Sequence, residues 1–227
     1  MPETARIILP APPPALIETI RADPDGNVPL LRFHLARLRT SCDALGYPCE
    51  LKRVRAAITA AAAATPGNPQ RLRLLLHSDG TWTLQATPLP PLHHRLTVVI
   101  WPARLDAAQP LLHHKTTHRP WYTDATRWLE AHPHCFDALF FNQRGELCEG
   151  SRSNVFLRIG GRWLTPPLRS GCLPGTQRAQ LLARGEVQEA SLHAADLRRA
   201  DGLRLSNGLR GWFDVAVDDL RPIAGDQ

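Results

Sequence analysis

Lysine is nearly absent from this chain of 227 residues. Lys52 and Lys115 are the only lysines among its 27 basic side chains, and the other 25 are arginines. A guanidinium group can replace the charge of lysine on a protein surface, but it stays protonated and cannot act as a neutral amine. The two lysines therefore need an explanation that the arginines do not.

Other absences argue against several classes of protein. No apolar run approaches the roughly 20 residues of a membrane-spanning helix, and residues 1–14 lack the basic start and apolar stretch of a signal peptide. The five cysteines form no Cys-x-x-Cys pair, which indicates a reduced, cytoplasmic setting. The formal charge of +6 comes from arginines scattered among acidic residues, so we expect no nucleic-acid or membrane partner. No strong zinc spacing is present, so we expect no metal.

The spacing of apolar residues predicts a small α+β unit in the first part of the chain. Pro29 is a favoured helix start and Gly46 a favoured helix end, so we expect a helix between them. Asp79-Gly80 between two alternating runs predicts a β-hairpin. The expected elements are a strand over residues 16–21, helices over 29–46 and 51–64, and strands over 71–77 and 81–86.

Beyond a proline-rich linker at residues 88–91, the chain is richer in strands. The expected elements are strands over residues 96–101, 136–142, 146–149, 155–159, 162–165 and 201–206, and helices over 121–131 and 174–185. We therefore predict an α+β fold with a small domain over residues 1–90 and a larger domain over residues 91–227.

Lys115 lies in a polar segment that also contains histidines and an arginine. Cationic neighbours lower the pKa of a lysine, and a neutral lysine amine can form a Schiff base. Taken alone, the segment is explained better by a surface lysine in a polar loop. Lys52 follows a turn on an amphipathic helix and is interpreted as a solvated surface residue.

Three further segments carry groups that could bind a ligand. Glu149 is a carboxylate at a strand end, and the small residues after it would let a ligand approach the backbone. The alternative interpretation of this segment is a glycine turn with an acidic residue on the surface. The helix start at residues 175–177 offers N–H groups to an anion, although many helices begin with Pro-Gly. Arg37 shares the polar side of its helix with His34 and could bind phosphate or simply face solvent.

Together these groups are the parts of a site for pyridoxal 5'-phosphate (PLP). The lysine would hold the aldehyde of the cofactor and the carboxylate would pair with its ring nitrogen. The arginine and the helix start would hold its phosphate.

Six segments then match one family in order along the chain, from about residue 16 to residue 212. They are IETIR at 17–21, HLARL at 34–38, HKTTHR at 114–119, EGSRSNVF at 149–156, LPGTQR at 173–178 and SNGLRG at 206–211. The sequence resembles the fold-type IV PLP enzymes, the class IV aminotransferase family, which have a two-domain α+β fold. Within the family it is most similar to 4-amino-4-deoxychorismate lyases, which implies the production of 4-aminobenzoate and pyruvate for folate synthesis.

The resemblance implies a role for each matched position. Lys115 is implied as the Schiff-base lysine, and Thr19 as a catalytic residue that positions the substrate or supplies a proton. The implied cofactor-binding residues are Arg37, Lys115, Glu149, Asn154, Gly175, Thr176, Gln177, Asn207 and Gly208, and the implied substrate-binding residues are Arg119, Tyr122 and Arg210. The resemblance also implies a homodimer, with aminodeoxychorismate synthase as a functional partner.

Departures from the family pattern leave two alternatives open. The first is a class IV aminotransferase acting on branched-chain or D-amino acids, which Thr19 disfavours because aminotransferases tend to have glycine there. The second is a shortened, non-catalytic homologue. Residues 10–14 stand where the family usually has a strand pair, and Gly208 replaces a usual serine. Pro120 also stands where aminotransferases have a tyrosine, which Tyr122 could replace.

Overall fold

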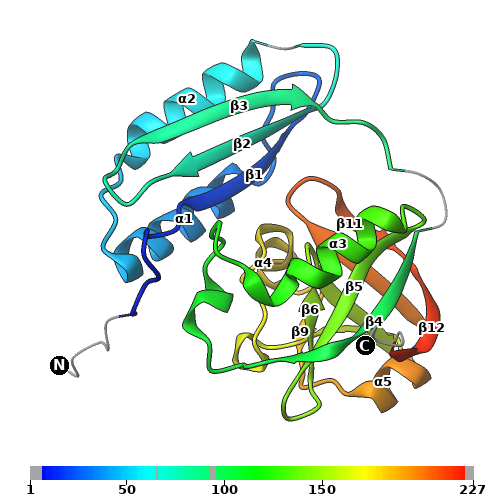
Figure 1. Ribbon diagram of the computed structural model, residues 1–227. Coiled ribbons are helices and arrows are strands. Elements are labelled where there is room, and N and C mark those ends of the chain that lie inside the picture. The colour runs from blue at the N-terminus through cyan, green and yellow to red at the C-terminus, as the bar shows by residue number, and fades with distance from the viewer. Residues whose placement is uncertain (1–6, 65, 93–95, 223–227) are drawn as a thin grey trace. The chain divides into compact units, whose positions relative to one another are not determined.

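The computed structural model describes residues 7–64, 66–92 and 96–222 (Figure 1). The chain divides into two compact units, Met1–Pro91 with His114–His118, and Leu92–His113 with Arg119–Gln227. The sequence division at residue 90 assigns His114–His118 to the second domain. In the structure this segment belongs to the first unit, because it pairs with the first strand.

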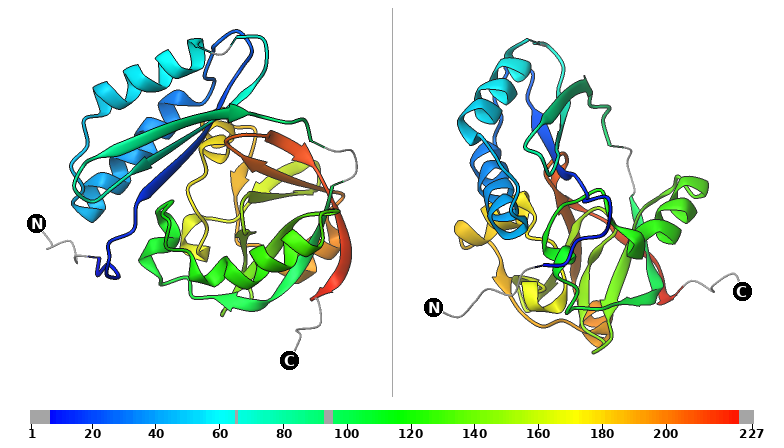
Figure 2. Two further views of the ribbon diagram at one scale, coloured as in Figure 1. Left: turned by 45° about the horizontal axis from the view of Figure 1, so that its top comes forward. Right: turned by 60° about the vertical axis from the view of Figure 1, so that its left-hand side comes forward.

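The first unit is a three-stranded antiparallel sheet with two helices along one face (Figure 1 and Figure 2). In sheet order the strands are β1 (Leu16–Ala22), β2 (Gln70–Leu76) and β3 (Trp82–Pro88), and the helices are α1 (Leu31–Leu45) and α2 (Leu51–Ala63). Side chains alternate across a strand, and the buried positions of β1 and β2 form one core with both helices. Gly46 ends α1 with a φ of 71°, in the left-handed region that glycine adopts without strain.

The second unit contains two sheets. The four-stranded sheet has the order β12 (Ala216–Pro222), β4 (Thr97–Leu105), β5 (Cys135–Asn142) and β6 (Leu147–Gly150). The five-stranded sheet has the order β11 (Gly211–Asp214), β10 (Gly202–Asn207), β7 (Asn154–Ile159), β8 (Arg162–Thr165) and β9 (Gln188–Glu189).

Strand β5 is buried on both of its faces. Leu139 and Phe141 lie in a hydrophobic cluster with residues of β7 and β10, which joins the two sheets. Ala138 and Phe140, on the opposite face, lie in a second cluster with residues of α3 (Thr123–Ala131). A strand covered on both sides is expected to be apolar almost throughout, and this explains why the polar side chain of Asp137 in β5 needs partners.

The elements expected from the sequence are present, with ends that differ by a few residues, and they confirm an α+β fold. The helix expected over 121–131 begins as a short 3-10 turn at Pro120–Tyr122 and becomes α-helical at Thr123, and α4 (Thr176–Ala183) begins two residues after Pro174. Four elements are too short or too polar to be expected from periodicity: α5 (Ala194–Arg199), β9, β11 and β12. Within the described ranges, no helix is long and apolar enough to cross a membrane.

Candidate active site

Lys115 is held beside β1 by backbone contacts. Its carbonyl oxygen accepts a 2.7 Å hydrogen bond from the amide of Ile17, and the next residue forms an antiparallel bridge with β1. The hydroxyl of Ser41, on α1, is hydrogen-bonded to Nδ1 of His114 at 2.9 Å. The lysine segment is therefore attached to both β1 and α1, although it is distant from them in the sequence.

Glu18 lies on the buried face of β1 and contacts two polar residues of α1. Its carboxylate accepts hydrogen bonds from Nε and Nη2 of Arg37 at 2.9 and 2.6 Å, and from Nδ1 of His34 at 2.6 Å. Burial raises the pKa of Glu18, but the charge of Arg37 and the hydrogen bond from His34 outweigh it and lower the pKa to about 2. Glu18 is therefore ionised and holds the guanidinium group in one orientation.

Two predicted site residues of the first unit lie in different surroundings. Arg37 lies on α1 against Glu18, whereas Thr19 lies half-buried on the opposite face of β1.

Glu149 is buried at the end of β6 in the second unit. Its carboxylate accepts a 2.5 Å hydrogen bond from the hydroxyl of Tyr122 and a 3.0 Å hydrogen bond from the amide of Leu173, with Nδ2 of Asn154 at 3.5 Å. Burial raises the pKa of Glu149 to about 7, even though these hydrogen bonds lower it. A positively charged partner would stabilise the ionised form of this buried carboxylate.

The start of α4 is arranged around Asn154 and Gly175. Nδ2 of Asn154 donates to the carbonyl oxygen of Leu173 at 2.9 Å, and a Cβ atom on Gly175 would overlap Oδ1 of Asn154, so glycine is required there. Thr176, the first residue of α4, is buried, and its hydroxyl has no hydrogen-bond partner in the part of the chain that the structure describes. The side chain of Gln177 donates to Gln180 at 3.2 Å. The free N–H groups of a helix start and a buried hydroxyl favour an anionic ligand.

Arg119 and Tyr122 contact each other. Nη2 of Arg119 donates to the carbonyl oxygen of Ser151 at 2.8 Å, and its guanidinium carbon lies 4.5 Å from the centre of the Tyr122 ring. Arg119 thus contacts both Tyr122 and the loop that follows β6. Both were expected to bind substrate; in the structure Tyr122 contacts the carboxylate of Glu149, and Arg119 contacts Tyr122.

Asn207, Gly208 and Arg210 form the turn between β10 and β11. Oδ1 of Asn207 accepts hydrogen bonds from the amides of Leu209 and Arg210 at 3.0 and 2.9 Å, which closes the turn. The preceding residue, Ser206, is buried, and its hydroxyl has no hydrogen-bond partner among the described residues. The end of β10 therefore offers another polar group suited to a ligand.

Comparison with known proteins decides the family. Residues 15–217 match the family model of amino-transferase class IV. The protein belongs to the class IV aminotransferase family.

Three known proteins illustrate the likeness. A provisionally assigned aminodeoxychorismate lyase of Schizosaccharomyces pombe is 29% identical over 197 residues, covering 82% of this chain and 83% of the relative. The structure of a provisionally assigned amino-acid aminotransferase of Mesorhizobium loti is 35% identical, with a TM-score of 0.82 over 90% of this chain and 99% of that one. A hypothetical aminotransferase of Mycobacterium tuberculosis, solved in its PLP-bound form, is 22% identical and shares the fold, with a TM-score of 0.77 over 99% of this chain and 90% of that one.

Class IV aminotransferases are PLP-dependent enzymes, so PLP is the cofactor of this protein. The residues present fit the group. The pKa of about 7 makes Glu149 a suitable partner for a protonated ring nitrogen, and the orphaned hydroxyl of Thr176 at a helix start suits a phosphate.

Sequence reasoning did not identify three buried polar residues as parts of the site. Glu18 contacts both Arg37 and His34, and Asp137 accepts hydrogen bonds from the hydroxyls of Ser151, at 2.6 Å, and Ser153. Asp137 thereby holds the loop that follows Glu149. For Asp137 the sequence did carry a signal, namely an acidic residue in a largely apolar strand. Burial of such a residue is favourable only when it has hydrogen-bond partners.

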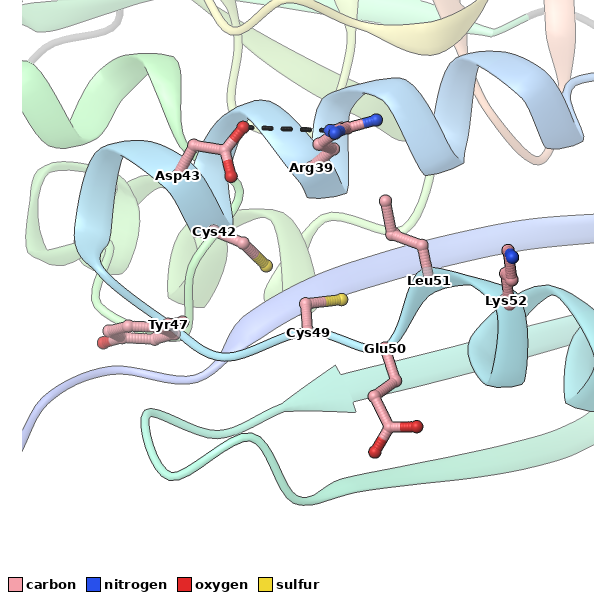
Figure 3. Close-up of a pocket in the computed structure, with 8 residues that line it drawn as sticks. All are labelled: Arg39, Cys42, Asp43, Tyr47, Cys49, Glu50, Leu51 and Lys52. Carbon is pink, nitrogen blue, oxygen red and sulfur yellow. Dashed lines mark ion pairs between the residues drawn. The ribbon is translucent and has the colours of Figure 1, made fainter.

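A cavity of about 460 Å³ lies in the first unit, between the end of α1 and the start of α2 (Figure 3). Its lining residues are Arg39, Cys42, Asp43, Tyr47, Cys49, Glu50, Leu51 and Lys52. None of them is a predicted cofactor or substrate residue, and Lys52 is exposed, as expected. Over the described residues, no group of three or more His, Cys, Asp or Glu side chains could hold a metal ion.

Proposed function

We propose that the protein is a PLP-dependent lyase that converts 4-amino-4-deoxychorismate into 4-aminobenzoate and pyruvate. The observation that carries this proposal is the match over most of the chain with a relative provisionally assigned that activity. Thr19 supports it, since threonine follows the glutamate of this strand in the lyases that the sequence resembles.

Most of the predicted residues have a proposed task. Lys115 binds the aldehyde of PLP, Glu149 pairs with the ring nitrogen, and Arg37 holds the phosphate. The amides of Thr176 and Gln177 assist with the phosphate, as do Gly175 and the turn at Asn207 and Gly208. Thr19 and Arg210 contact the substrate. When bound, PLP supplies an electron-withdrawing ring that stabilises negative charge on the substrate carbon next to nitrogen.

The reaction requires one proton to be removed and one bond to be broken. Lys115, with its amine free once the substrate amino group has replaced it on the aldehyde, would accept the proton from the ring carbon that bears the amino group. The bond between the ring and the enolpyruvyl oxygen then breaks, and the departing group takes up a proton to become pyruvate. The remaining ring is aromatic, which supplies driving force.

The two lysines provide the test. The purified protein with PLP, incubated with 4-amino-4-deoxychorismate, should release 4-aminobenzoate and pyruvate in equal amounts. Lys115→Arg should abolish this release because a guanidinium group cannot form the bond to the aldehyde, whereas Lys52→Arg should retain full activity. Equal activity of the wild type and Lys115→Arg would overturn the proposal.

A class IV aminotransferase is the second candidate, favoured by the 35% identical structure from Mesorhizobium loti. In that reaction Lys115 would remove the proton from the substrate carbon, and PLP would supply the acceptor for the amino group. An amino-acid donor added without an acceptor would then convert the absorbance of the bound cofactor to that of its amine form. We expect no such conversion. The third candidate is a non-catalytic homologue. It would be supported if the purified protein bound no PLP.

We further propose two domains divided near residue 90, with His114–His118 in the first. We also propose a cytoplasmic homodimer, and a synthase of aminodeoxychorismate as the source of the substrate. These proposals rest on the family resemblance. Sedimentation of the purified protein tests the dimer, which predicts about twice the 25.2 kDa mass of one chain.

A further inference from the structure

Glu18 is a buried carboxylate in contact with the arginine that is proposed to bind phosphate. It is 2% exposed and receives two hydrogen bonds from Arg37 and one from His34. Charged side chains are almost never buried this deeply unless they are paired. The two residues of α1 therefore account for the burial of Glu18, and Glu18 in turn determines how both are oriented.

The contact with Arg37 is bidentate. Nε donates to Oε1 and Nη2 donates to Oε2, so the planar guanidinium and carboxylate groups meet along one edge. Two such bonds prevent rotation of a side chain that otherwise has many rotamers, and Arg37 is 8% exposed at its side chain. The arginine is thus ordered before a ligand binds, which lowers the entropy lost on binding.

The contact with His34 determines the position of its proton. An ionised carboxylate can only accept hydrogen bonds, so Nδ1 of His34 is the donor at 2.6 Å. Burial lowers the pKa of His34, and the charges of Arg37 and Lys115 lower it further, although the contact with Glu18 opposes this. The ring is therefore neutral, with a lone pair on Nε2, which is buried and has no hydrogen-bond partner among the described residues.

We propose that Glu18 is a positioning residue that orients Arg37 for the phosphate of the cofactor and holds the proton of His34 on Nδ1. This inference rests on the proposed function of Arg37. Glu18 acts through Arg37 and does not contact the phosphate, because two anions repel each other. The same carboxylate orients the His34 ring through the hydrogen bond at Nδ1. The charge of Lys115 is one of the causes that lower the pKa of that ring.

The test compares two ligands that differ by one phosphate group. PLP and pyridoxal are titrated into the full chain, and the wild type should bind PLP more tightly. Glu18→Gln should weaken PLP binding about tenfold, since hydrogen bonds between charged groups contribute at about this level, and should leave pyridoxal binding within about twofold. Glu50→Gln is the matched control, because Glu50 is an exposed partner of Arg53 in the same unit. It should change neither affinity.

A double mutant separates positioning from general damage. In an Arg37→Met background, Glu18→Gln should have no further effect on PLP affinity, because its effect passes through Arg37. If the losses of PLP affinity in the two single mutants add up in the double mutant, or if Glu18→Gln keeps the wild-type preference for PLP over pyridoxal, this inference is wrong and the proposed function still stands. A wild type that binds no PLP would overturn the proposed function and this inference with it.

A measurement on the wild type covers the case in which Glu18→Gln fails to fold. Nitrogen NMR of the histidine rings at neutral pH, with His34 assigned by its loss in His34→Gln, reports which ring nitrogen carries the proton. We expect Nδ1 to be protonated and Nε2 unprotonated. Protonation on Nε2 alone would show that Glu18 does not accept from His34 and would overturn the inference.

Discussion

The hydroxyl of Tyr122 donates a 2.5 Å hydrogen bond to Oε1 of Glu149, and both groups are buried. Burial and the charge of Glu149 raise the pKa of Tyr122 well above its ordinary value, so the phenol keeps its proton. The same hydrogen bond lowers the pKa of Glu149 against the effect of burial. Tyr122 therefore favours the ionised form of Glu149, which is the form that can pair with a cationic ring nitrogen.

Tyr122→Phe should weaken PLP binding about tenfold, because the loss of a hydrogen bond to a charged group makes ionisation of Glu149 less favourable. The measurement is a titration of the cofactor-free protein with PLP. Tyr47→Phe is the matched control, since its hydroxyl is also buried and donates to the carbonyl oxygen of Pro14 at 2.8 Å. A similar loss of affinity in both variants would contradict the prediction.

The raised pKa of Glu149 predicts how the stability of the cofactor-free protein depends on pH. Burial raises this pKa from 4.5 to about 7, so between these values the folded state keeps a proton that the unfolded state has lost. Stability should therefore fall as pH rises through this window, by about 3 kcal/mol in total. Urea unfolding of the wild type and Glu149→Gln at several pH values measures the difference. Parallel curves for the two proteins would refute the prediction.

Asp137→Asn should destabilise the protein by about 2 kcal/mol, because the amide cannot accept all the hydrogen bonds that the carboxylate receives. These come from the hydroxyls of Ser151 and Ser153 and from the amides of Ala138 at 2.8 Å and Arg152 at 3.3 Å. Asp124→Asn, at an exposed ion pair on α3, should change stability little. Chemical unfolding compares them, and a variant of Asp137 as stable as the wild type would be evidence against this role.

Gly175→Ala should be more harmful than an ordinary exchange of glycine for alanine. The added Cβ would overlap Oδ1 of Asn154, whereas a Cβ on Gly202 would come no closer than 3.1 Å to its neighbours. Neither glycine has a positive φ, so the difference reflects space alone. We expect Gly175→Ala to lose about 2 kcal/mol of stability and Gly202→Ala to lose less. Thermal unfolding tests the order, and the reverse order would contradict the structure.

The first unit was predicted closely because its signals are local. Proline and glycine mark the ends of α1, and the Asp79-Gly80 turn lies between strands that pair in the expected hairpin. In the second unit, α5 and β12 carry polar sequences whose placement depends on neighbours that are distant in the chain. Periodicity therefore gave no reason to expect them.

The candidate site shows the same division. Lys115, Glu149 and the helix start after Gly175 could be predicted because they match an ordered set of motifs of the family to which the chain belongs. The tasks of Tyr122 and Arg119 could not, since their contacts with Glu149 and Ser151 join elements that are separated in the chain.

The sequence by itself determined the fold class, most helices and strands, and the family with its cofactor, because periodicity, turn residues and motif order are written along the chain. Only the tertiary structure decided which polar groups meet. Glu18 contacts Arg37 and His34, and Asp137 contacts the loop after Glu149, because strand register and helix packing bring these side chains to one place. Burial then gives each contact its strength, since a charged group removed from water must find partners in the protein.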